Sequence, residues 1–171
     1  MKKSKPSTYA FIDSQNLNLG VKSQGWQLDW RKFRQYLRNK YNATKAYLFI
    51  GQLAGNESLY TFLQECGYIL VFKPTLELPD GTVKGNVDAE LVLHAMIHFK
   101  HYDKAIIVTG DGDFHCLVEY LVQEVKLHRL FAPNRKYSSL LRKFNRYIVR
   151  VDLLKASLEI KKAKINVRSK P

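Results

Sequence analysis

The sequence predicts an α/β protein built as a three-layer α/β/α sandwich with a mostly parallel central sheet. Short apolar segments of strand length alternate with segments in which apolar residues recur every three or four positions. The chain has 171 residues, 46% of them hydrophobic, which is typical of one globular domain with its own core. Because strands separated by helices pair in parallel through right-handed crossovers, we expect helices on both faces of the sheet.

The first predicted element is a buried strand at Tyr9–Ile12, an apolar run that ends at Asp13. The polar residues 14–16 follow it and predict a loop. Asp29 then precedes a predicted helix, so strand and helix alternate from the start. The apolar residues of this helix recur at spacings of three and four, at Phe33, Tyr36, Leu37 and Tyr41.

The middle of the chain repeats this order. A strand is expected at Ala46–Ile50, followed by a helix at Leu59–Cys66 that ends at Gly67. Tyr68–Phe72 has the pattern of the next strand, and residues 79–81 (Pro-Asp-Gly) predict a turn. These elements extend the sheet by two strands.

The second half contains the longest apolar helix pattern. Val87–Phe99 is apolar almost all round, as expected of a helix packed between other elements. A strand is expected at Lys104–Thr109 and a helix at Phe114–Val122, with the glycine-rich residues 110–113 between them. The series ends with a strand at Leu127–Phe131, a helix near Ser138–Phe144 and a strand at Tyr147–Val151.

Four aspartates lie where such a sheet would gather them. In open parallel sheets, ligands bind at the carboxyl ends of the strands, where the connecting loops diverge. Asp13 and Asp111 follow two such ends, and Asp113 comes two residues after Asp111. Asp88 lies near the start of the helix that precedes this second strand. We therefore expect one acidic pocket. Crowded carboxylates usually need a cation, and oxygen ligands favour Mg²⁺ or Mn²⁺.

Each aspartate also has a local interpretation. Asp113 could be the N-cap of the helix that follows it, and Asp111 could serve its glycine-rich turn. Asp88 could stabilise a helix N-terminus electrostatically. An ionised Asp13 at the end of an apolar strand costs free energy without a partner, so a turn role explains it least well. The coincidence of all four favours a metal site suited to phosphodiester cleavage.

Positive charge is concentrated in three parts of the chain. The net charge is +13, and residues 126–150 contain eight lysines or arginines and no acid. Both ends are rich in lysine, whereas the part that carries the aspartates is mildly acidic. A basic surface favours a polyanion because phosphate contacts release counterions, so nucleic acid is the leading partner. The lysine-rich ends could equally be solubilising tails.

Membrane, secreted and metal–thiolate classes are not favoured. The longest apolar run, Leu91–Ile97, is far shorter than the roughly 20 residues that cross a bilayer. The basic start lacks the apolar stretch of a secretory signal, so we expect a cytoplasmic protein. Cys66 and Cys116 have apolar neighbours and no C-x-x-C spacing, and we expect both to be reduced core thiols.

Three segments resemble, in order and spacing, the motifs of NYN domains, which belong to the PIN-like nuclease superfamily. They are residues 11–17 (FIDSQNL), 84–91 (KGNVDAEL) and 109–114 (TGDGDF), and the LabA-like group is the most similar. We therefore expect a basic N-terminal tail at 1–8, an NYN/PIN-like domain at 9–154 and a basic C-terminal extension at 155–171. The resemblance implies a PIN-like, Rossmann-like fold, a Mg²⁺ or Mn²⁺ site, and RNA as the usual substrate.

The resemblance also implies roles for individual residues. The four aspartates match the acidic positions of the family, and Asn16 matches its asparagine after the first strand. Asn16 could hydrogen-bond a phosphate, orient Asp13 or form only an Asx-type turn. Many relatives carry a further acid near the position of His94. Glu90 could replace that acid or point elsewhere, and His94 is expected to be a packed helix residue.

Six basic residues are candidates for contacts with nucleic-acid phosphates. Lys84 stands beside the second motif, and the other five belong to the basic block: Arg135, Lys136, Arg142, Lys143 and Arg146. Tyr137 could be a stacking platform for a base. The alternative is an ordinary solvated helix face with a core aromatic. His115, just after the third motif, has no assigned role.

The leading functional hypothesis is a metal-dependent endoribonuclease that hydrolyses RNA at the aspartates. The alternative is a nucleic-acid-binding or regulatory interaction module with the same fold and little or no cleavage, which His94 in place of an acid favours. A haloacid-dehalogenase-like phosphatase needs a second aspartate two residues after its nucleophile, whereas Gln15 occupies that position after Asp13. DNA as a second substrate and a homodimer are left open.

Overall fold

A parallel sheet forms the centre of the molecule in the computed structural model, which describes residues 6–74, 76–77, 79, 83–84 and 87–161. Its six strands lie in the order β3-β2-β1-β6-β7-β8, and all neighbouring pairs are parallel. The strands are β1 (Thr8–Asp13), β2 (Ala43–Gln52), β3 (Ile69–Pro74), β6 (Lys104–Val108), β7 (Leu127–Ala132) and β8 (Ile148–Arg150). The predicted parallel sheet is confirmed.

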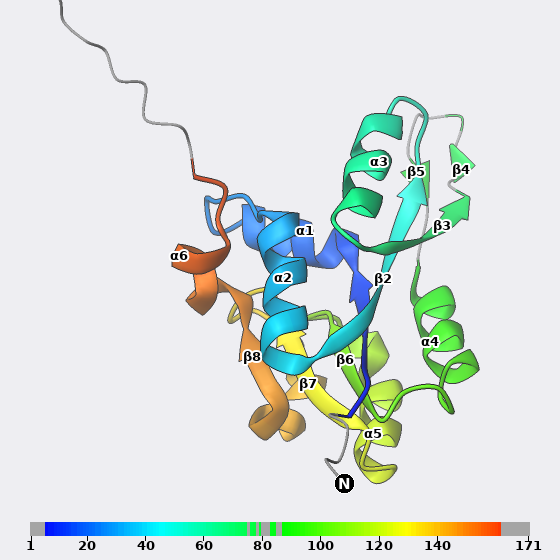
Figure 1. Cartoon of the computed structure of the whole chain (residues 1–171), viewed down its shortest axis with the longest axis vertical. Coiled ribbons are helices and arrows are strands. Elements are labelled where there is room, and N and C mark those ends of the chain that lie inside the picture. The colour runs from blue at the N-terminus through cyan, green and yellow to red at the C-terminus, as the bar shows by residue number, and fades with distance from the viewer. Residues whose placement is uncertain (1–5, 75, 78, 80–82, 85–86, 162–171) are drawn as a thin grey trace, which may run out of the picture.

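Helices cover both faces of this sheet, as Figure 1 shows. One face carries α1 (Ser14–Lys22), α2 (Trp30–Tyr41) and α3 (Glu57–Glu65). The other carries α4 (Asp88–Ile97), α5 (His115–Gln123) and the 3-10 helix η2 (Ser139–Tyr147). Shorter pieces are η1 (Gly112–Phe114), η3 (Val151–Leu154) and α6 (Lys155–Leu158). The three-layer α/β/α sandwich is therefore confirmed. Within the described ranges, no helix is long and apolar enough to cross a membrane.

The central strand β1 supplies the core on both sides of the sheet. Ala10 and Ile12 belong to the apolar cluster beneath α1 and α2, whereas Tyr9 and Phe11 belong to the cluster beneath α4 and α5. Successive side chains of a strand point to opposite faces, and both faces of a sandwiched strand are buried. This is why the strand is a continuous apolar run that ends at its first charged residue, Asp13.

The order of the strands creates a switch point between β1 and β6. The chain first builds β1, β2 and β3 outward in one direction, and it then returns to place β6 on the free side of β1. Ile12 pairs with Val108 at the carboxyl ends of these two strands. Loops that leave such a pair diverge to opposite faces, which opens a crevice where ligands bind in open α/β sheets. The fold therefore brings the segments after β1 and β6 together.

The segment after β1 is helical, not the loop that its polar residues predicted. Helix α1 begins at Ser14, and the side chain of Asp13 caps it by accepting a hydrogen bond from the backbone N–H of Asn16 at 3.1 Å. Leu17 and Val21, four residues apart, are buried against the sheet. An N-cap aspartate followed by this spacing is a helix-start signal, which the polar residues at 14–16 concealed.

The two ends of the chain join the folded domain more closely than the predicted boundaries suggest. Thr8 is buried in β1, and Leu158 of α6 is buried in the core. Asp29 donates a backbone hydrogen bond to the carbonyl of Leu158 at 2.8 Å. The first residues of the predicted C-terminal extension therefore pack on the domain, whereas residues 162–171 and 1–5 lie outside the described residues.

The two cysteines differ in their exposure to solvent. Cys116 is exposed, so the prediction that it is a core thiol is wrong, whereas Cys66 is half-buried. Leu117 and Val118, the apolar residues that follow Cys116, are buried, but they occupy a different side of the helix.

Around the predicted turn, β4 (Leu76–Glu77) and β5 (Val83–Lys84) form an antiparallel pair. The turn residues Asp80 and Gly81 themselves lie outside the described residues.

Candidate metal centre

Three carboxylates meet at the switch point of the sheet. Among the residues that the structure describes, Asp88, Asp111 and Asp113 each offer one oxygen atom, and these atoms lie within 4.8 Å of one another. Asp88 is the first residue of α4, Asp111 is the N-cap of η1, and Asp113 lies within η1. Asp88 and Asp111 are half-buried and Asp113 is exposed, so the group is open to solvent on one side. We call these three residues the aspartate cluster.

The donor set of the aspartate cluster suits a hard divalent cation. All three ligand candidates are carboxylate oxygens, which Mg²⁺, Mn²⁺ and Ca²⁺ prefer. Oxygens on one octahedral Mg²⁺ are about 3 Å apart when adjacent and about 4.2 Å apart when opposite, at a metal–oxygen distance of about 2.1 Å. The three oxygens lie within 4.8 Å of one another, so side-chain rotations that shorten these distances would bring them onto one ion. The residues therefore fit a metal site.

Asp13 lies beside the aspartate cluster but deeper in the protein. Its exposed fraction is 6%, and one of its carboxylate oxygens is engaged as the cap of α1. Burial raises the pKa of Asp13 to about 6, opposed by the hydrogen bond from Asn16 and reinforced by the charges of Asp88 and Asp111. Ionised Asp13 is therefore costly to the folded protein, and a neighbouring cation would lower that cost.

Asn16 connects the segment after β1 to the segment after β6. Its backbone N–H donates to Asp13, and its side-chain Oδ1 accepts a hydrogen bond from the backbone N–H of Gly110 at 2.8 Å. The two hydrogen bonds fix the start of α1 against the loop that carries Asp111. The side chain of Asn16 thus holds the loop before Asp111, a contact that was not among the roles considered from sequence.

The loop that carries two of the aspartates is held by its own hydrogen bonds. The backbone N–H of Asp111 donates to Thr109 Oγ1 at 3.1 Å, and Asp111 Oδ1 accepts from the backbone N–H of Asp113 at 3.0 Å. The turn role therefore belongs to Asp111, as one interpretation of the sequence held. Asp113 is not a helix N-cap, because η1 intervenes and Phe114 takes the N-cap position of α5.

A second loop, residues 133–138, packs directly against the first. Ser138 donates its backbone N–H to the carbonyl of Gly110 at 2.9 Å. A Cβ atom added at Gly112 would lie 2.3 Å from Ser138 Oγ, so only glycine fits there. Arg135 and Lys136 are exposed on this second loop. Two of the predicted phosphate contacts are thus carried by a loop that is fastened to the acidic loop.

The other predicted phosphate contacts differ in whether their side chains are exposed and whether their charges are paired. Arg142 and Arg146 are exposed on η2, and the Arg146 guanidinium lies over the Tyr147 ring, 4.8 Å from its centroid. Lys143 is exposed but forms an ion pair with Glu119 at 2.6 Å, which lowers the pKa of that carboxyl. Lys84 belongs to β5, and its side chain lies outside the described residues. Tyr137 is half-buried against the core beneath α4 and α5.

Neither Glu90 nor His94 joins the aspartate cluster. Glu90 forms an ion pair with Lys73 at 3.3 Å and so faces β3. His94 packs edge-on against Phe49, with ring centroids 5.5 Å apart, and its buried Nδ1 has no hydrogen-bond partner among the described residues. His94 is therefore a packed helix residue, as predicted. His115, which had no assigned role, places Nδ1 3.0 Å from the Gly112 carbonyl oxygen.

Sequence reasoning missed the polar residues that hold these loops. Thr109 fixes Asp111, and Ser138 fixes Gly110. Asn134 anchors the second loop, because its Nδ2 donates to the carbonyl of Gly20 at 2.8 Å. The Pro-Asn dipeptide at 133–134 is a turn signal, and Ser138 is a helix-start signal before η2. These signals indicate local structure, but they do not reveal which distant segment each residue contacts.

Comparison with known proteins gives a family match, one relative and one similar structure. Residues 7–158 match the family described as NYN domain. The chain is 27% identical over 128 residues to the low amplitude and bright protein LabA of Synechococcus elongatus, which covers 68% of this chain and 69% of that protein. A crystal structure of a protein of unknown function from Vibrio parahaemolyticus superposes with a TM-score of 0.78 at 21% identity. It covers 94% of this chain and 99% of that one, and it supports the fold alone.

Proposed function

Because the chain belongs to the NYN domain family, in its LabA-like group of the PIN-like nuclease superfamily, we propose that it is a Mg²⁺- or Mn²⁺-dependent endoribonuclease. NYN domains are PIN-like nucleases, so a nucleic acid is the substrate class that the family supports. The observation that carries the proposal is the aspartate cluster, with its three oxygens within 4.8 Å at the switch point of the sheet. RNA is the proposed substrate.

The acidic residues would contribute to cation binding in two ways. Asp88, Asp111 and Asp113 would be its ligands, and Asp13 would add negative charge from beneath them. When bound, a divalent cation supplies Lewis-acid activation of water and neutralises charge on the phosphate under attack. Asn16 would keep Asp111 in place through Gly110, as a residue that orients a ligand from behind.

The basic residues offset the repulsion between an acidic site and a polyanionic substrate. Arg135 and Lys136 project from the loop that is fastened to Gly110, so they would bind phosphates on either side of the bond to be cut. Arg142 and Arg146 would extend this basic track along η2. Lys143 would contribute less, because its ammonium group is paired with Glu119.

An Asp111→Asn substitution tests the proposal with little disturbance of the loop. Asparagine retains the Oδ1 atom that accepts from the Asp113 N–H, but it lacks the charge of a ligand. Cleavage of a panel of structured and unstructured RNA and DNA would be measured with Mg²⁺, Mn²⁺ or a chelator. We expect a loss of about 100-fold or more in RNA cleavage, and no cleavage by the wild type in chelator.

The matched control for that experiment is Glu124→Gln. Glu124 is an exposed acid at the far end of α5 from the aspartate cluster, so the change removes the same charge without touching the site. Unchanged activity in the Asp111→Asn protein, prepared free of other nucleases, would overturn the proposal. A loss of similar size in the Glu124→Gln protein would show that net charge, not the cluster, is responsible.

A second candidate function is a nucleic-acid-binding or regulatory interaction module that cuts slowly or not at all. The observation that favours it concerns α4, where Glu90 is paired with Lys73 and His94 packs on Phe49. No further acid from these positions supports the cluster. Tight, salt-sensitive RNA binding without Mn²⁺-dependent cleavage would favour this function, whereas robust turnover would exclude it.

A further inference from the structure

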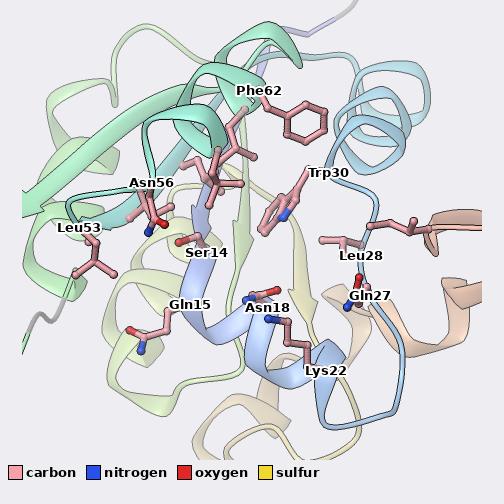
Figure 2. A pocket seen from close by; sticks show the side chains of 16 residues that line it. Ser14, Gln15, Asn18, Lys22, Gln27, Leu28, Trp30, Leu53, Asn56 and Phe62 are labelled. Carbon is pink, nitrogen blue, oxygen red and sulfur yellow. The ribbon is translucent and has the colours of Figure 1, made fainter. Parts of the chain in front are cut away.

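A pocket of about 610 Å³ lies on the α1–α3 side of the sheet, beside the residues that follow Asp13. It is bounded by α1, the end of β2, α3 and the start of α2, as Figure 2 shows. Ser14 and Gln15, which line it, directly follow Asp13 in the chain. Its volume is within the roughly 300–1,000 Å³ range of small-molecule sites. The backbone at the end of β1 thus separates two sites, one acidic and one not.

The chemistry of this pocket differs from that of the aspartate cluster. Its lining residues include one cation, Lys22, and no acid. The walls are largely apolar and include two aromatic side chains, Trp30 and Phe62. Four carboxamide side chains supply both hydrogen-bond donors and acceptors: Gln15, Asn18, Gln27 and Asn56. Flat aromatic faces combined with amide groups suit a planar ligand with polar edges.

We propose that this pocket binds one unpaired nucleobase of the nucleic acid whose backbone lies across the aspartate cluster. The inference rests on the proposed function and deepens it, because it makes the substrate class single-stranded or locally unpaired. Asp13 lies beside the aspartate cluster and is followed directly by the pocket residues Ser14 and Gln15, so a phosphate next to the captured base would lie near the aspartates.

The aromatic side chains are held in place before any ligand arrives. The Trp30 ring packs edge-on against Tyr68, with centroids 5.9 Å apart, and the Tyr68 hydroxyl donates to the Trp30 carbonyl at 2.8 Å. The Arg31 guanidinium lies 5.5 Å from the centroid of the Phe62 ring. Stacking of a base on such a ring is tolerant of sequence, and a preformed site loses less entropy on binding.

A paired base could not use this site. In a duplex, each base is stacked on both faces and its polar edge is engaged with a partner. Entry between α1 and α3 requires the base to leave the stack, and this is least costly where the strand is already unpaired. The single cation among the lining residues, Lys22, is the last residue of α1, so it would contact a different phosphate of the same strand from the one at the aspartates.

Tryptophan fluorescence provides a direct test, because the chain contains two tryptophans and one of them lines the pocket. A Trp26→Phe substitution leaves Trp30 as the reporter. Trp26 is buried, and its Nε1 has no hydrogen-bond partner within the described ranges, so phenylalanine loses no such bond. The full chain would also carry Asp111→Asn, so that binding is separated from cleavage. We expect quenching by an eight-nucleotide single-stranded RNA and none by the same sequence as a perfect duplex.

Two pocket variants and one control locate the binding site. Phe62→Ala removes a stacking face and Asn18→Ala removes an amide, and each is expected to weaken single-strand binding about five-fold or more. Gln24→Ala, an exposed amide just beyond α1 that does not line the pocket, should leave binding unchanged. Thermal melting of each variant checks its fold, and Asn18 is a half-buried residue whose loss should leave the melting temperature within a few degrees.

The outcomes separate this inference from the proposed function. Equal quenching by duplex and single strand, or unchanged affinity in both pocket variants, would overturn the base pocket while leaving endoribonuclease activity intact. Quenching by an apolar dye but not by RNA would also overturn it, in favour of another occupant. Single-strand quenching that both variants weaken, in a protein whose wild type cuts no RNA, would support the pocket and overturn the proposed function alone.

Discussion

Asn16 and Gly110, from opposite halves of the chain, are joined by a hydrogen bond of 2.8 Å from the Gly110 backbone N–H to the Asn16 side-chain oxygen. The bond ties the start of α1, which Asp13 caps, to the loop that presents Asp111. This single hydrogen bond therefore helps to set the position of Asp13 relative to Asp111.

Asn16→Ala is expected to weaken Mn²⁺ binding and RNA cleavage together, each by about 10- to 100-fold. This is the usual effect of removing a residue that orients a metal ligand. Asn16→Asp supplies the comparison, because aspartate can still accept from Gly110. Isothermal titration with Mn²⁺ and initial cleavage rates are the measurements. If Asn16→Ala loses cleavage but keeps full Mn²⁺ affinity, Asn16 contacts the substrate instead.

Asp13→Asn is expected to stabilise the metal-free protein at neutral pH. Burial raises the pKa of Asp13 from 3.8 to about 6, so the folded state holds the proton more tightly than the unfolded state. Stability of the wild type therefore falls as the pH rises through this window, by about 3 kcal/mol in total. Asparagine cannot ionise, and it retains an oxygen to cap α1.

Urea unfolding in chelator measures this effect. At pH 7.5 the Asp13→Asn protein should exceed the wild type by about 3 kcal/mol, and at pH 4 by less than about 1 kcal/mol. A variant that is less stable than the wild type at both pH values would contradict the buried-charge explanation. It would indicate that the hydrogen bond that Asp13 accepts at the start of α1 stabilises the folded state by more than the burial of its charge destabilises it.

Mn²⁺ is expected to raise the melting temperature of the wild type at pH 7.5. A ligand at 100 times its dissociation constant stabilises the folded state by about 2.7 kcal/mol when it does not bind the unfolded chain. Burial raises the pKa of Asp13 to about 6, so at pH 5 this residue is mostly protonated and adds less negative charge beside the cation; the shift should therefore be smaller at pH 5. Differential scanning fluorimetry, with chelator to reverse the shift, is the measurement. Asp111→Asn should lose most of it.

Arg34 is expected to be a stabilising residue without any role in activity. It is 8% exposed, and it donates to three backbone carbonyls on two segments: Gly67 at 3.0 Å, and at the start of β2 Ala43 at 3.0 Å and Thr44 at 3.4 Å. Arg34→Met would leave these carbonyls without their donor, at a cost of about 3 kcal/mol. Arg38→Met, on the exposed side of the same helix, is the control and should change stability by less than about 0.5 kcal/mol.

Arg135 and Lys143 are expected to differ in their contribution to RNA binding. Both are exposed, but Lys143 is paired with Glu119 at 2.6 Å, whereas Arg135 stands on the loop beside Gly110. Arg135→Ala should weaken binding and reduce the slope of log K against log salt by about 1, the effect of one lost phosphate contact. Lys143→Ala should change this slope by less than half as much. Equal effects would argue for a diffuse basic surface.

The sequence predicted the features that follow from a pattern of apolar and polar residues along the chain. The parallel sheet was predictable because apolar strands such as Tyr9–Ile12 are buried on both faces and carry no alternation. The aspartates could be located because strand ends in such a sheet fall at one edge. Helix α1 was missed because three polar residues follow its cap, although Leu17 and Val21 have helical spacing.

Pairings between distant residues could not be predicted. The partner of Lys143 is Glu119 on another helix, and the partner of the Asn16 side chain is a backbone N–H that any residue could supply. The pocket beside Asp13 has the same limit, because its lining comes from segments as distant as Ser14 and Ile160. Shape and pairing arise from tertiary packing, and a single sequence carries no periodic signal for either.

The position of β1 in the sheet also determines when the candidate site can form during synthesis. Thr8 of β1 lies opposite Lys104 of β6, so β1 cannot pair with β6, its second neighbouring strand, until most of the domain has been translated. At about 5–20 residues per second, the ribosome needs roughly 5–20 s to reach that point. Asp13 and Asp88 are therefore made before Asp111 and Asp113. We expect a nascent chain to reach β3 as a partly formed sheet with no assembled aspartate cluster, so that any hydrolytic capacity arises only when β6 and η1 have joined it.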